Sequence, residues 1–530
     1  MTRKTNPIQT QKRASQTRIV PFTQRATHLF LPKPALSFTI FRKDIDYLGG
    51  KTMQSFAKKI ITLTLSVLFI CLAAAANDDN NVGSKKVPLK DRPSDVKGAA
   101  ENQALMVGVS EVNITPPVGT PMAGGFQPRF SIGVQDPLFV KAIVLESEGK
   151  RLAYVILDLI ALGREDGDRC VEKASRLSGI PADSIVWACT HTHTGPYTGP
   201  IFGLEESGID KQWLASLPDA FARAVAEADT RKKPASMSVM RSFVVGIADN
   251  RRITFKNGRA INTWNLAAAG EDLGQSVGSE GPVDPELGIL AFDDTKGRLL
   301  AVLFQYTLHT NLNFGKYLSA DYPGVVYAKL RERFGPNTVT LFVPGACANI
   351  NSWGYSYRQV GETISAAIIA KLDKRKPIAG AVKLASLKRD IDIEYRDLSA
   401  DQEERIKAAF FAEKDRDVFR RELEVMRKQG FTKARTVLQA WRIGDVGFAS
   451  LPGELFVEWG LKIKRESPFT WTFPVTLAGD YQGYLVTEEA WKAGGYESLI
   501  ARSAKPAPAA VAEMSDAALA MLNEIYAPAK

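Results

Sequence analysis

Histidine is rare in this chain, and two of its four histidines stand one residue apart in the segment ACTHTHTGP. His191 and His193 follow directly on the apolar run 184–190, and His309 ends another apolar run. If the chain stays extended there, residues two apart point to the same side, so both imidazoles of the pair could face one pocket. Three histidines at strand ends favour a metal site, whereas a hydrogen-bonded pair in a turn is the alternative without a metal.

A zinc site commonly adds a carboxylate and keeps an open position for water. Three acids could serve here: Asp158 after an apolar run, Asp321 in SADYPG, and Glu454 in LPGE. Each also has a purely structural interpretation, because an Asp before a turn often caps a helix and Glu454 could be a surface acid. The residues alone leave this choice open.

The apolar runs that end at these residues alternate with helical patterns. Residues 151–162 form one run, a helical pattern then ends at Gly179, and residues 184–190 form the next run. A strand–helix–strand order predicts a parallel pair of strands. The run ending at His309 and residues 338–346 continue the pattern, and the spacing at 357–372 predicts an amphipathic helix.

We therefore expect an α/β fold with mixed, largely parallel sheets, flanking helices, and a single large catalytic domain over residues 105–530. The charged residues 398–430 have helical spacing and predict exposed helices. Residues 436–454 predict a hairpin that turns at Gly444-Asp445, and the end of the chain predicts a last helix near 514–526.

The first 104 residues are expected to lie outside that domain. Residues 53–76 combine lysines, an apolar run and a stretch of alanines, which is typical of a secretory signal peptide. Residues 1–52 then form an over-extended leader, and the polar residues 77–104 a flexible linker. We expect an exported protein, periplasmic or secreted, in which bulky Ile70 disfavours a lipid anchor at Cys71.

The net charge of +10 belongs to the leader. Residues 1–76 contain 12 Lys and Arg against two Asp and Glu, which leaves 56 basic and 56 acidic residues in the remainder. This balance gives no indication of a nucleic-acid partner, and contact with a membrane is expected to be peripheral at most. Cys170, Cys189 and Cys347 lack metal-site spacing and allow one disulfide at most. The sequence leaves the oligomeric state open.

Six motifs in order resemble those of the neutral/alkaline (non-lysosomal) ceramidase family, zinc-dependent amidohydrolases that release a fatty acid from N-acylsphingosine. They extend over roughly residues 105–500 and read VGVSEVNITPPVGTPMAGG (107–125), VQDPLFVKAIVLE (134–146), ACTHTHTGP, QYTLHTNL with LSADYPG, LPGELF, and YQGYLVTEEAWKAGGYE. The match is to the N-terminal catalytic domain of the family. Only 34 residues follow Tyr496, too few for the C-terminal β-sandwich domain of the larger ceramidases.

The resemblance implies one zinc ion per chain and a zinc-dependent hydrolase of an N-acyl bond in a small molecule or lipid. The zinc ligands that it implies are His191, His309, Glu454 and Tyr484. It also implies that His193 supports the ligands or polarises the substrate, and that Arg251 and Tyr496 line the active site. Both tyrosines could instead be core residues with satisfied hydroxyls.

One departure from the family concerns the catalytic serine. The family has a Gly-Asp-Val-Ser-Pro segment whose serine is assigned as the nucleophile, and the matching stretch here is PGACANINSW (344–353). Asn351 stands at the serine position, Asn349 replaces the aspartate, and Ser352 lies one residue further on. Because asparagine is no nucleophile, we expect zinc-activated water to attack, with Asn351 available to donate a hydrogen bond to the developing oxyanion.

Two other functions are compatible with the sequence. The chain could be a zinc hydrolase that acts on a different amide, an ester or a cell-wall fragment, which tests on matched amides and esters would reveal. It could also be a non-catalytic zinc-containing binding protein that has lost the family serine. A closed four-ligand zinc site without turnover would indicate that second function.

Overall fold

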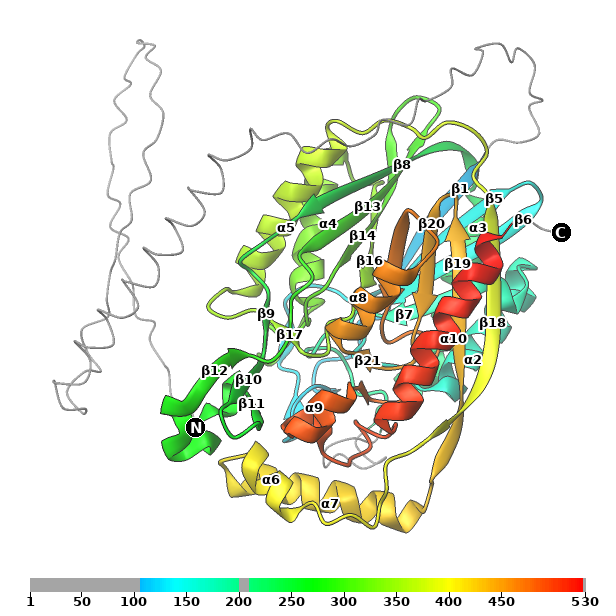
Figure 1. The fold of residues 1–530 in the computed structure, drawn as a ribbon. Helices are drawn as coiled ribbons and strands as arrows, with labels where there is room; N and C mark the ends of the chain where they lie inside the picture. Colours follow the sequence, from blue (N-terminus) through cyan, green and yellow to red (C-terminus); the bar gives the residue numbers. More distant parts are fainter. Residues whose placement is uncertain (1–104, 200–208, 528–530) are drawn as a thin grey trace, which may run out of the picture. The chain divides into compact units, whose positions relative to one another are not determined.

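The computed structural model describes residues 105–199 and 209–527, whose two large β-sheets are covered by helices and accompanied by smaller sheets of two or three strands (Figure 1). These residues belong to one compact unit. The expected leader 1–52, signal peptide 53–76, linker 77–104 and Cys71 lie outside the described residues. Within the described ranges, no helix is long and apolar enough to span a bilayer.

The main sheet has eight strands. In spatial order they are β16 (Val339–Pro344), β14 (Leu299–Tyr306), β13 (Glu286–Asp294), β8 (Lys233–Phe243), β1 (Met106–Asn113), β5 (Phe139–Ser147), β6 (Lys150–Leu157) and β7 (Ile185–Cys189). The α/β class is confirmed, but the expectation of largely parallel sheets was wrong. Only β14–β16 and β6–β7 are parallel in this sheet, and its other neighbours are antiparallel. The turns that join β5 to β6 and β13 to β14 are too short for a crossover, which forces antiparallel pairing.

The second sheet has four strands and faces the first. Its order is β18 (Leu384–Glu394), β19 (Lys433–Ile443), β20 (Val446–Ser450) and β22 (Trp471–Val475). The hairpin β19–β20 confirms the turn predicted at Gly444-Asp445. A core between the sheets contains apolar side chains of both, and the rings of Trp441 and Phe448 stack there 4.9 Å apart. Sheet-on-sheet burial of this kind is the main stabilising contact of layered folds.

Helices cover the outer faces of both sheets (Figure 1). Over the main sheet lie α2 (Arg164–Ser178), α3 (Lys211–Thr230), α4 (Asp321–Phe334) and α5 (Tyr357–Leu372), and over the second sheet α8 (Val457–Glu466) and α10 (Pro508–Tyr526). Helix α5 has the predicted bounds and begins with a capping box between Ser356 and Gln359. Helix α2 ends where Gly179 takes a left-handed conformation, φ 69°. Helix α10 begins earlier than the predicted residue 514 because Pro508 opens its first turn.

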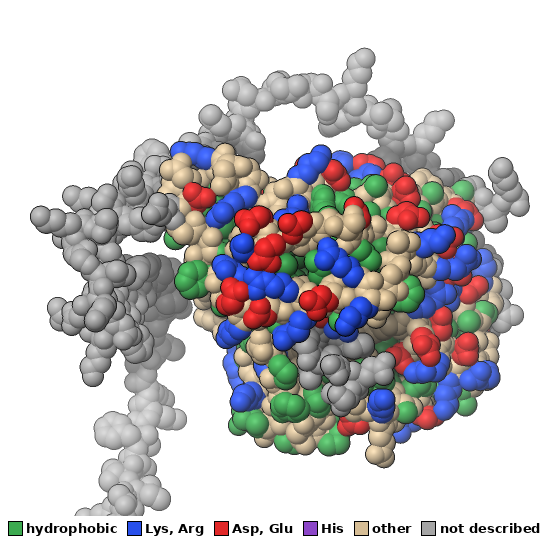
Figure 2. Space-filling view, turned by 90° about the horizontal axis from the view of Figure 1, so that it is seen from below, with side chains coloured by type: hydrophobic (Ala, Val, Ile, Leu, Met, Phe, Trp, Pro, Cys, Tyr) green, Lys and Arg blue, Asp and Glu red, His purple; other side chains and the backbone are tan. Residues whose placement is uncertain are grey.

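The charged region predicted at 398–430 forms α6 (Glu403–Ala409) and α7 (Glu413–Gln429). Both helices lie at the bottom of Figure 1, and the face seen from that side carries acidic and basic side chains side by side (Figure 2). Arg420 of α7 contacts Glu403 and Glu413 there. Elsewhere in the fold, Cys170, Cys189 and Cys347 are buried and unpaired, so the disulfide that the sequence allowed does not form.

Candidate metal centre and active-site cavity

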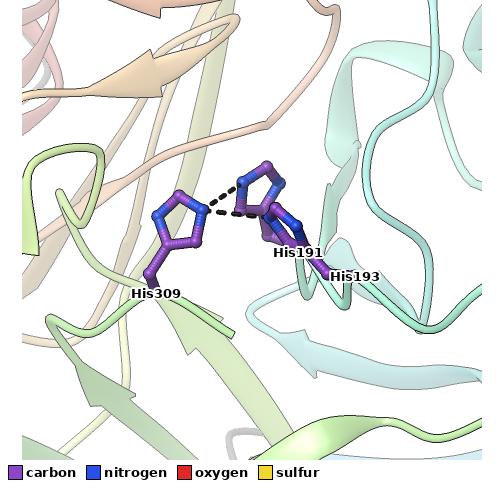
Figure 3. Close-up of side chains that lie close together, drawn as sticks. All are labelled: His191, His193 and His309. Atoms are coloured by element: carbon purple, nitrogen blue, oxygen red, sulfur yellow. Dashed lines mark hydrogen bonds between the residues drawn. The ribbon is translucent and has the colours of Figure 1, made fainter. Parts of the chain in front are cut away.

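Three imidazoles meet beyond the carboxyl ends of two strands of the main sheet (Figure 3). His191 and His193 follow β7, and His309 follows β14. Backbone hydrogen bonds fix both segments: the N–H of His191 donates to the carbonyl oxygen of Leu159 at 2.8 Å, and that of His309 to Ile350 at 3.1 Å. The location matches the rule that ligands bind outside the carboxyl ends of strands in open sheets.

The Nε2 atoms of the three rings point toward one another (Figure 3). His309 Nε2 lies 3.0 Å from His191 Nε2 and 3.1 Å from His193 Nε2. The ligand atoms of all three residues lie within 4.8 Å of one another. This buried cluster could hold a metal ion.

The other ring nitrogen of each histidine shows which tautomer is present. His191 Nδ1 lies 2.7 Å from the carbonyl oxygen of Ile160. His193 Nδ1 lies 2.9 Å from that of Gly124, and His309 Nδ1 3.2 Å from that of Cys347. A carbonyl oxygen only accepts, so each Nδ1 carries the proton and each Nε2 presents a lone pair. Three lone pairs that converge on one point repel one another and together suit a cation.

Burial favours the uncharged rings. It is the largest cause that holds the pKa of His193 and of His309 well below the usual value, and the neighbouring His191 lowers both further. Neutral imidazole is the form that binds a metal.

Glu454 is the acid that reaches the cluster. Its Oε2 lies 3.2 Å from His191 Nε2 and is buried without a hydrogen-bond partner among the described residues, while its Oε1 accepts a hydrogen bond from Tyr481 at 2.9 Å. An orphaned carboxylate oxygen beside imidazole lone pairs is a favourable position for a cation, and a nitrogen–oxygen donor set of this kind fits zinc. Glu454 in β21 (Glu454–Leu455) is also the direct strand partner of Tyr484 in β23 (Tyr484–Leu485).

The other two candidate acids have structural partners away from the cluster. Asp158 Oδ2 accepts the backbone N–H of Phe139, and Asp321 accepts those of Asn313 and Tyr322. Neither residue lines the cavity described next. Of the three acids, Glu454 is the one that lies beside the cluster and lines the cavity.

A cavity of about 1140 Å³ surrounds the cluster. The seven residues that the resemblance implied, and Asn351 at the serine position, all line it: His191, His193, Arg251, His309, Asn351, Glu454, Tyr484 and Tyr496. The segments that follow β6, β7, β14 and β16 contribute residues to its lining, as do the segments that follow β20 and β22. The volume suits a small molecule or part of a lipid.

Arg251 links the outer residues of the site. Its guanidinium donates to Tyr484 Oη at 3.1 Å and lies 3.4 Å from Asn351 Oδ1. Tyr484 and Tyr496 share a hydrogen bond of 3.0 Å between their hydroxyls. Burial opposes the charge of Arg251, but Tyr484 and Glu497 outweigh it, so its pKa is raised. Burial also raises the pKa of Tyr484 well above its ordinary value, and a bound metal would favour the tyrosinate.

Asn349 and Ser352, which lie on either side of Asn351 in the segment that matches the family serine, have different surroundings. Asn349, at the family aspartate position, is fully buried. Its Oδ1 accepts a hydrogen bond from the backbone N–H of Val457, and its Nδ2 donates one to Glu458. It ties the loop after β16 to α8 and does not line the cavity. Ser352 does line it, and its Oγ is buried without a hydrogen-bond partner among the described residues.

Two backbone positions shape the cluster. His191 has a positive φ of 68°, which is uncommon outside glycine and is tolerated where surrounding contacts hold the residue. Gly124 has a φ of 89°, and a Cβ there would lie 2.5 Å from the ring of His193. The MAGG motif therefore has a physical role, because glycine at this position leaves room for the imidazole.

Sequence reasoning missed three residues of the site. Tyr481 donates a hydrogen bond to Glu454, Glu497 accepts one of 2.9 Å from Arg251, and the carbonyl oxygen of Gly124 accepts one from His193 Nδ1. Two of them adjoin residues that were selected: Glu497 follows Tyr496, and Tyr481 opens the YQGY segment that contains Tyr484. That proximity was the one available signal.

No family model matches the chain. Among curated proteins, the neutral ceramidase of Pseudomonas aeruginosa is 23% identical over 205 residues, which cover 36% of this chain and 28% of that protein. The aligned sequence thus spans less than a third of the relative's length. Among solved structures, the crystal structure of neutral ceramidase from Pseudomonas aeruginosa matches with a TM-score of 0.62 at 17% identity and covers 81% of this chain and 76% of that one.

A structure of ceramidase complexed with C2 matches equally well, with a TM-score of 0.61 at 17% identity over 81% of this chain and 76% of that one. At this identity the structural match establishes the fold. The chain has the neutral ceramidase fold, and its resemblance to the neutral ceramidase family is confirmed.

Proposed function

We propose that the chain is a zinc-dependent hydrolase of an N-acyl (amide) bond, similar in its chemistry to neutral ceramidase. The observation that carries the proposal is that the Nε2 lone pairs of His191 and His309 meet the orphaned carboxylate oxygen of Glu454 in a single cavity, with His193 Nε2 beside them. The likeness to neutral ceramidase supports an amide as the bond and a lipid as the substrate class.

The proposed zinc ligands are His191, His309, Glu454 and Tyr484. Zinc in this position would supply Lewis-acid polarisation of a carbonyl and a water of lowered pKa. The Nε2 of His193 lies 3.1 Å from that of His309, and its Nδ1 donates to the carbonyl oxygen of Gly124. We assign His193 to the substrate, where a neutral imidazole nitrogen can accept a proton.

Arg251, Tyr496 and Asn351 stabilise the reacting amide in this proposal. The guanidinium of Arg251 lies against Asn351 Oδ1, which leaves the Asn351 amide N–H₂ as the donor for a substrate oxygen. A donor preorganised at a developing oxyanion contributes roughly 3–4 kcal/mol to lowering the barrier. No side chain in this arrangement needs to become acylated.

The test uses the purified protein, its metal content and a panel of substrates. We expect about one zinc per chain, amide hydrolysis that chelation abolishes, and recovery of hydrolysis when zinc is restored. The panel pairs N-acyl amides with esters of the same acyl chain and includes an N-acylsphingosine. His309→Ala is expected to lose both metal and activity.

The outcomes separate the alternatives. Faster hydrolysis of the esters would replace the amide bond by an ester as the natural substrate. Stoichiometric zinc without hydrolysis of any substrate would favour a binding protein. A protein that binds no zinc would refute the proposal. We also propose that the protein is exported, which detection of the chain in the periplasmic or secreted fraction, and not in the cytosol, would support.

A further inference from the structure

Arg251 divides its guanidinium between the active site and the protein interior. One side faces the cavity, where Nη2 donates to Tyr484 Oη at 3.1 Å and Nη1 lies 3.4 Å from Asn351 Oδ1. The Nε–H donates on the opposite side to Glu497 Oε1 at 2.9 Å. The side chain is buried, and its guanidinium lies 4.7 Å from the centre of the Trp264 ring.

Glu497 is wholly buried and surrounded by donors. Besides Arg251, Oε1 accepts a hydrogen bond from Asn262 Nδ2 at 2.6 Å, and Oε2 accepts one from Arg252 Nη1 at 2.7 Å. Burial alone would raise the pKa of this carboxyl, but Arg251 and Arg252 lower it below its usual value. The carboxylate is therefore charged and satisfied.

The contact continues as a chain of alternating charges. Arg252, also fully buried, pairs with Glu280, and its Nη2 lies 2.9 Å from Glu280 Oε1. The order is thus Arg251, Glu497, Arg252, Glu280, and the side chain of the last is 15% exposed. Charges cancel along the chain, which offsets the high cost of burying each of them alone.

This arrangement matters because Arg251 lies beside the proposed metal centre. Its Nη1 is 3.4 Å from His309 Nδ1, so a guanidinium would face a second cation when the site is loaded. A buried charge without a counter-charge is strongly unfavourable. Glu497 supplies that counter-charge at Nε, so that Nη1 and Nη2 remain available to groups in the cavity.

We infer that Glu497 is a positioning residue of the site. Through the Arg251–Glu497 contact it fixes the orientation of Arg251 and balances the charge of its guanidinium. The part of the inference that concerns catalysis rests on the proposed function. The inference also has a consequence for metal binding, because removal of the Glu497 charge leaves an unbalanced guanidinium near the ligands and weakens the attraction for a divalent cation.

The test is a double-mutant cycle with Glu497→Gln, Arg251→Gln and the double variant. Glutamine keeps the size of the side chain and removes its charge. We expect Glu497→Gln to lower kcat by about 10–100-fold, the range typical of groups that orient active-site residues, with KM changed by less than about threefold. If Glu497 acts through Arg251, the double variant is no slower than Arg251→Gln alone.

Two controls separate positioning from general stability. Asp293 makes a similarly close pair with Arg375, at 2.7 Å, outside the cavity lining, so Asp293→Asn is expected to lower the melting temperature without changing kcat. Glu280→Gln removes a counter-charge of Arg252 and leaves the Arg251–Glu497 pair in place, so it is expected to lower kcat less than Glu497→Gln does. If Glu497→Gln does not fold, Glu497→Asp replaces it in the same cycle.

Zinc affinity gives a readout that needs no substrate. We expect Glu497→Gln to bind zinc about tenfold more weakly in a competition assay with a chelating dye, and Asp293→Asn to bind as the wild type does. Additive losses of kcat in the cycle, or a zinc affinity and kcat no different from those of Asp293→Asn, would overturn the inference. Failure of the wild type to hydrolyse any amide would refute the proposed function, and the zinc comparison would still decide the role of Glu497.

Discussion

The Nε2 atoms of His191 and His309 lie 3.0 Å apart, although each ring already uses its Nδ1–H on a backbone carbonyl. Two imidazole nitrogens without a proton between them gain nothing from such proximity in the absence of a cation. The backbone holds them together nonetheless, through a left-handed residue at His191 and a strand-end hydrogen bond at His309. The site is therefore organised in advance for a ligand that accepts lone pairs.

His309 and His193 are expected to respond differently to substitution. His309→Ala should reduce the zinc content to a small fraction of one per chain, because His309 faces both other rings. His193→Ala should retain near-stoichiometric zinc and lose amide hydrolysis by about 10²–10⁴-fold, the contribution typical of a group that transfers protons. Metal analysis after gel filtration measures the first and initial rates the second. Loss of zinc from His193→Ala would move His193 into the set of ligands.

Gly124 allows a test of how closely the His193 ring is confined. Gly124→Ala should displace the ring, because the new Cβ would lie 2.5 Å from its Cγ, and activity should fall at least tenfold. Gly119 is the matched control, since its φ of 97° is also positive but a Cβ there meets nothing within 4 Å. Gly119→Ala should cost about 1–3 kcal/mol of backbone strain and leave the rate constant unchanged. Equal losses of activity in both variants would assign the effect to strain in the loop.

Tyr481 is expected to tune the metal ligand Glu454 without touching the metal. Tyr481→Phe removes the donor to Glu454 Oε1 and should weaken zinc binding about 10–100-fold. Tyr306→Phe provides the comparison, because that buried hydroxyl donates to the carbonyl oxygen of Val244 outside the cavity lining. It should cost about 1 kcal/mol of stability and leave zinc affinity unchanged. An unchanged zinc affinity in Tyr481→Phe would show that Glu454 needs no orientation by this tyrosine.

Strand existence could be predicted from the sequence, but strand direction could not. Residues 151–162 and 184–190 became the parallel strands β6 and β7 because a helix connects them, as the pattern indicated. The main sheet is covered by helices on one face and the second sheet on the other, so its antiparallel strands are as continuously apolar as parallel ones. Apolar runs of that kind do not reveal that most strand pairs of the main sheet are antiparallel.

The residues of the site also divide into those that could be predicted from the sequence and those that could not. Rarity and strand-end position were enough to select His191, His193 and His309. Glu454 was one of three candidate acids until the resemblance to a family selected it, and Tyr484, Arg251 and Tyr496 came from that resemblance alone. Tyr481 and Glu497 depend on contacts between segments distant in the chain, Glu454 to Tyr481 and Arg251 to Glu497. Local spacing contains no information on such contacts.

Asn351 and Ser352 distinguish hydrolysis by water from an acyl-serine route. Asn351→Ala should lower kcat by about 10²–10³-fold, as expected for the loss of one oxyanion donor. Ser352→Ala should stay within about threefold of the wild type, because no base contacts its buried Oγ in the described structure. Rapid-quench kinetics with a chromogenic N-acyl amide should show no burst of the released amine. A burst that disappears in Ser352→Ala would establish Ser352 as the nucleophile.

Asp158 should make the stability of the protein depend on pH through a group outside the metal centre. Burial raises its pKa to about 7, against the opposing charge of Lys141 and with support from Asp136 and Glu111. Because the folded-state pKa lies above the unfolded one, the favourable contribution of the protonated form is complete below about pH 4 and is lost as the pH rises to about 7.

Asp158→Asn keeps an acceptor for the Phe139 N–H and removes this titration. On going from pH 5 to pH 8, the free energy of unfolding of the variant should therefore rise relative to that of the wild type by on the order of 2 kcal/mol. Urea unfolding of both proteins at the two pH values, with zinc saturating throughout, measures the difference. Since zinc binding affects both proteins alike, it cancels in the comparison. A stability difference that is the same at pH 5 and pH 8 would show that Asp158 keeps an ordinary pKa in the folded protein.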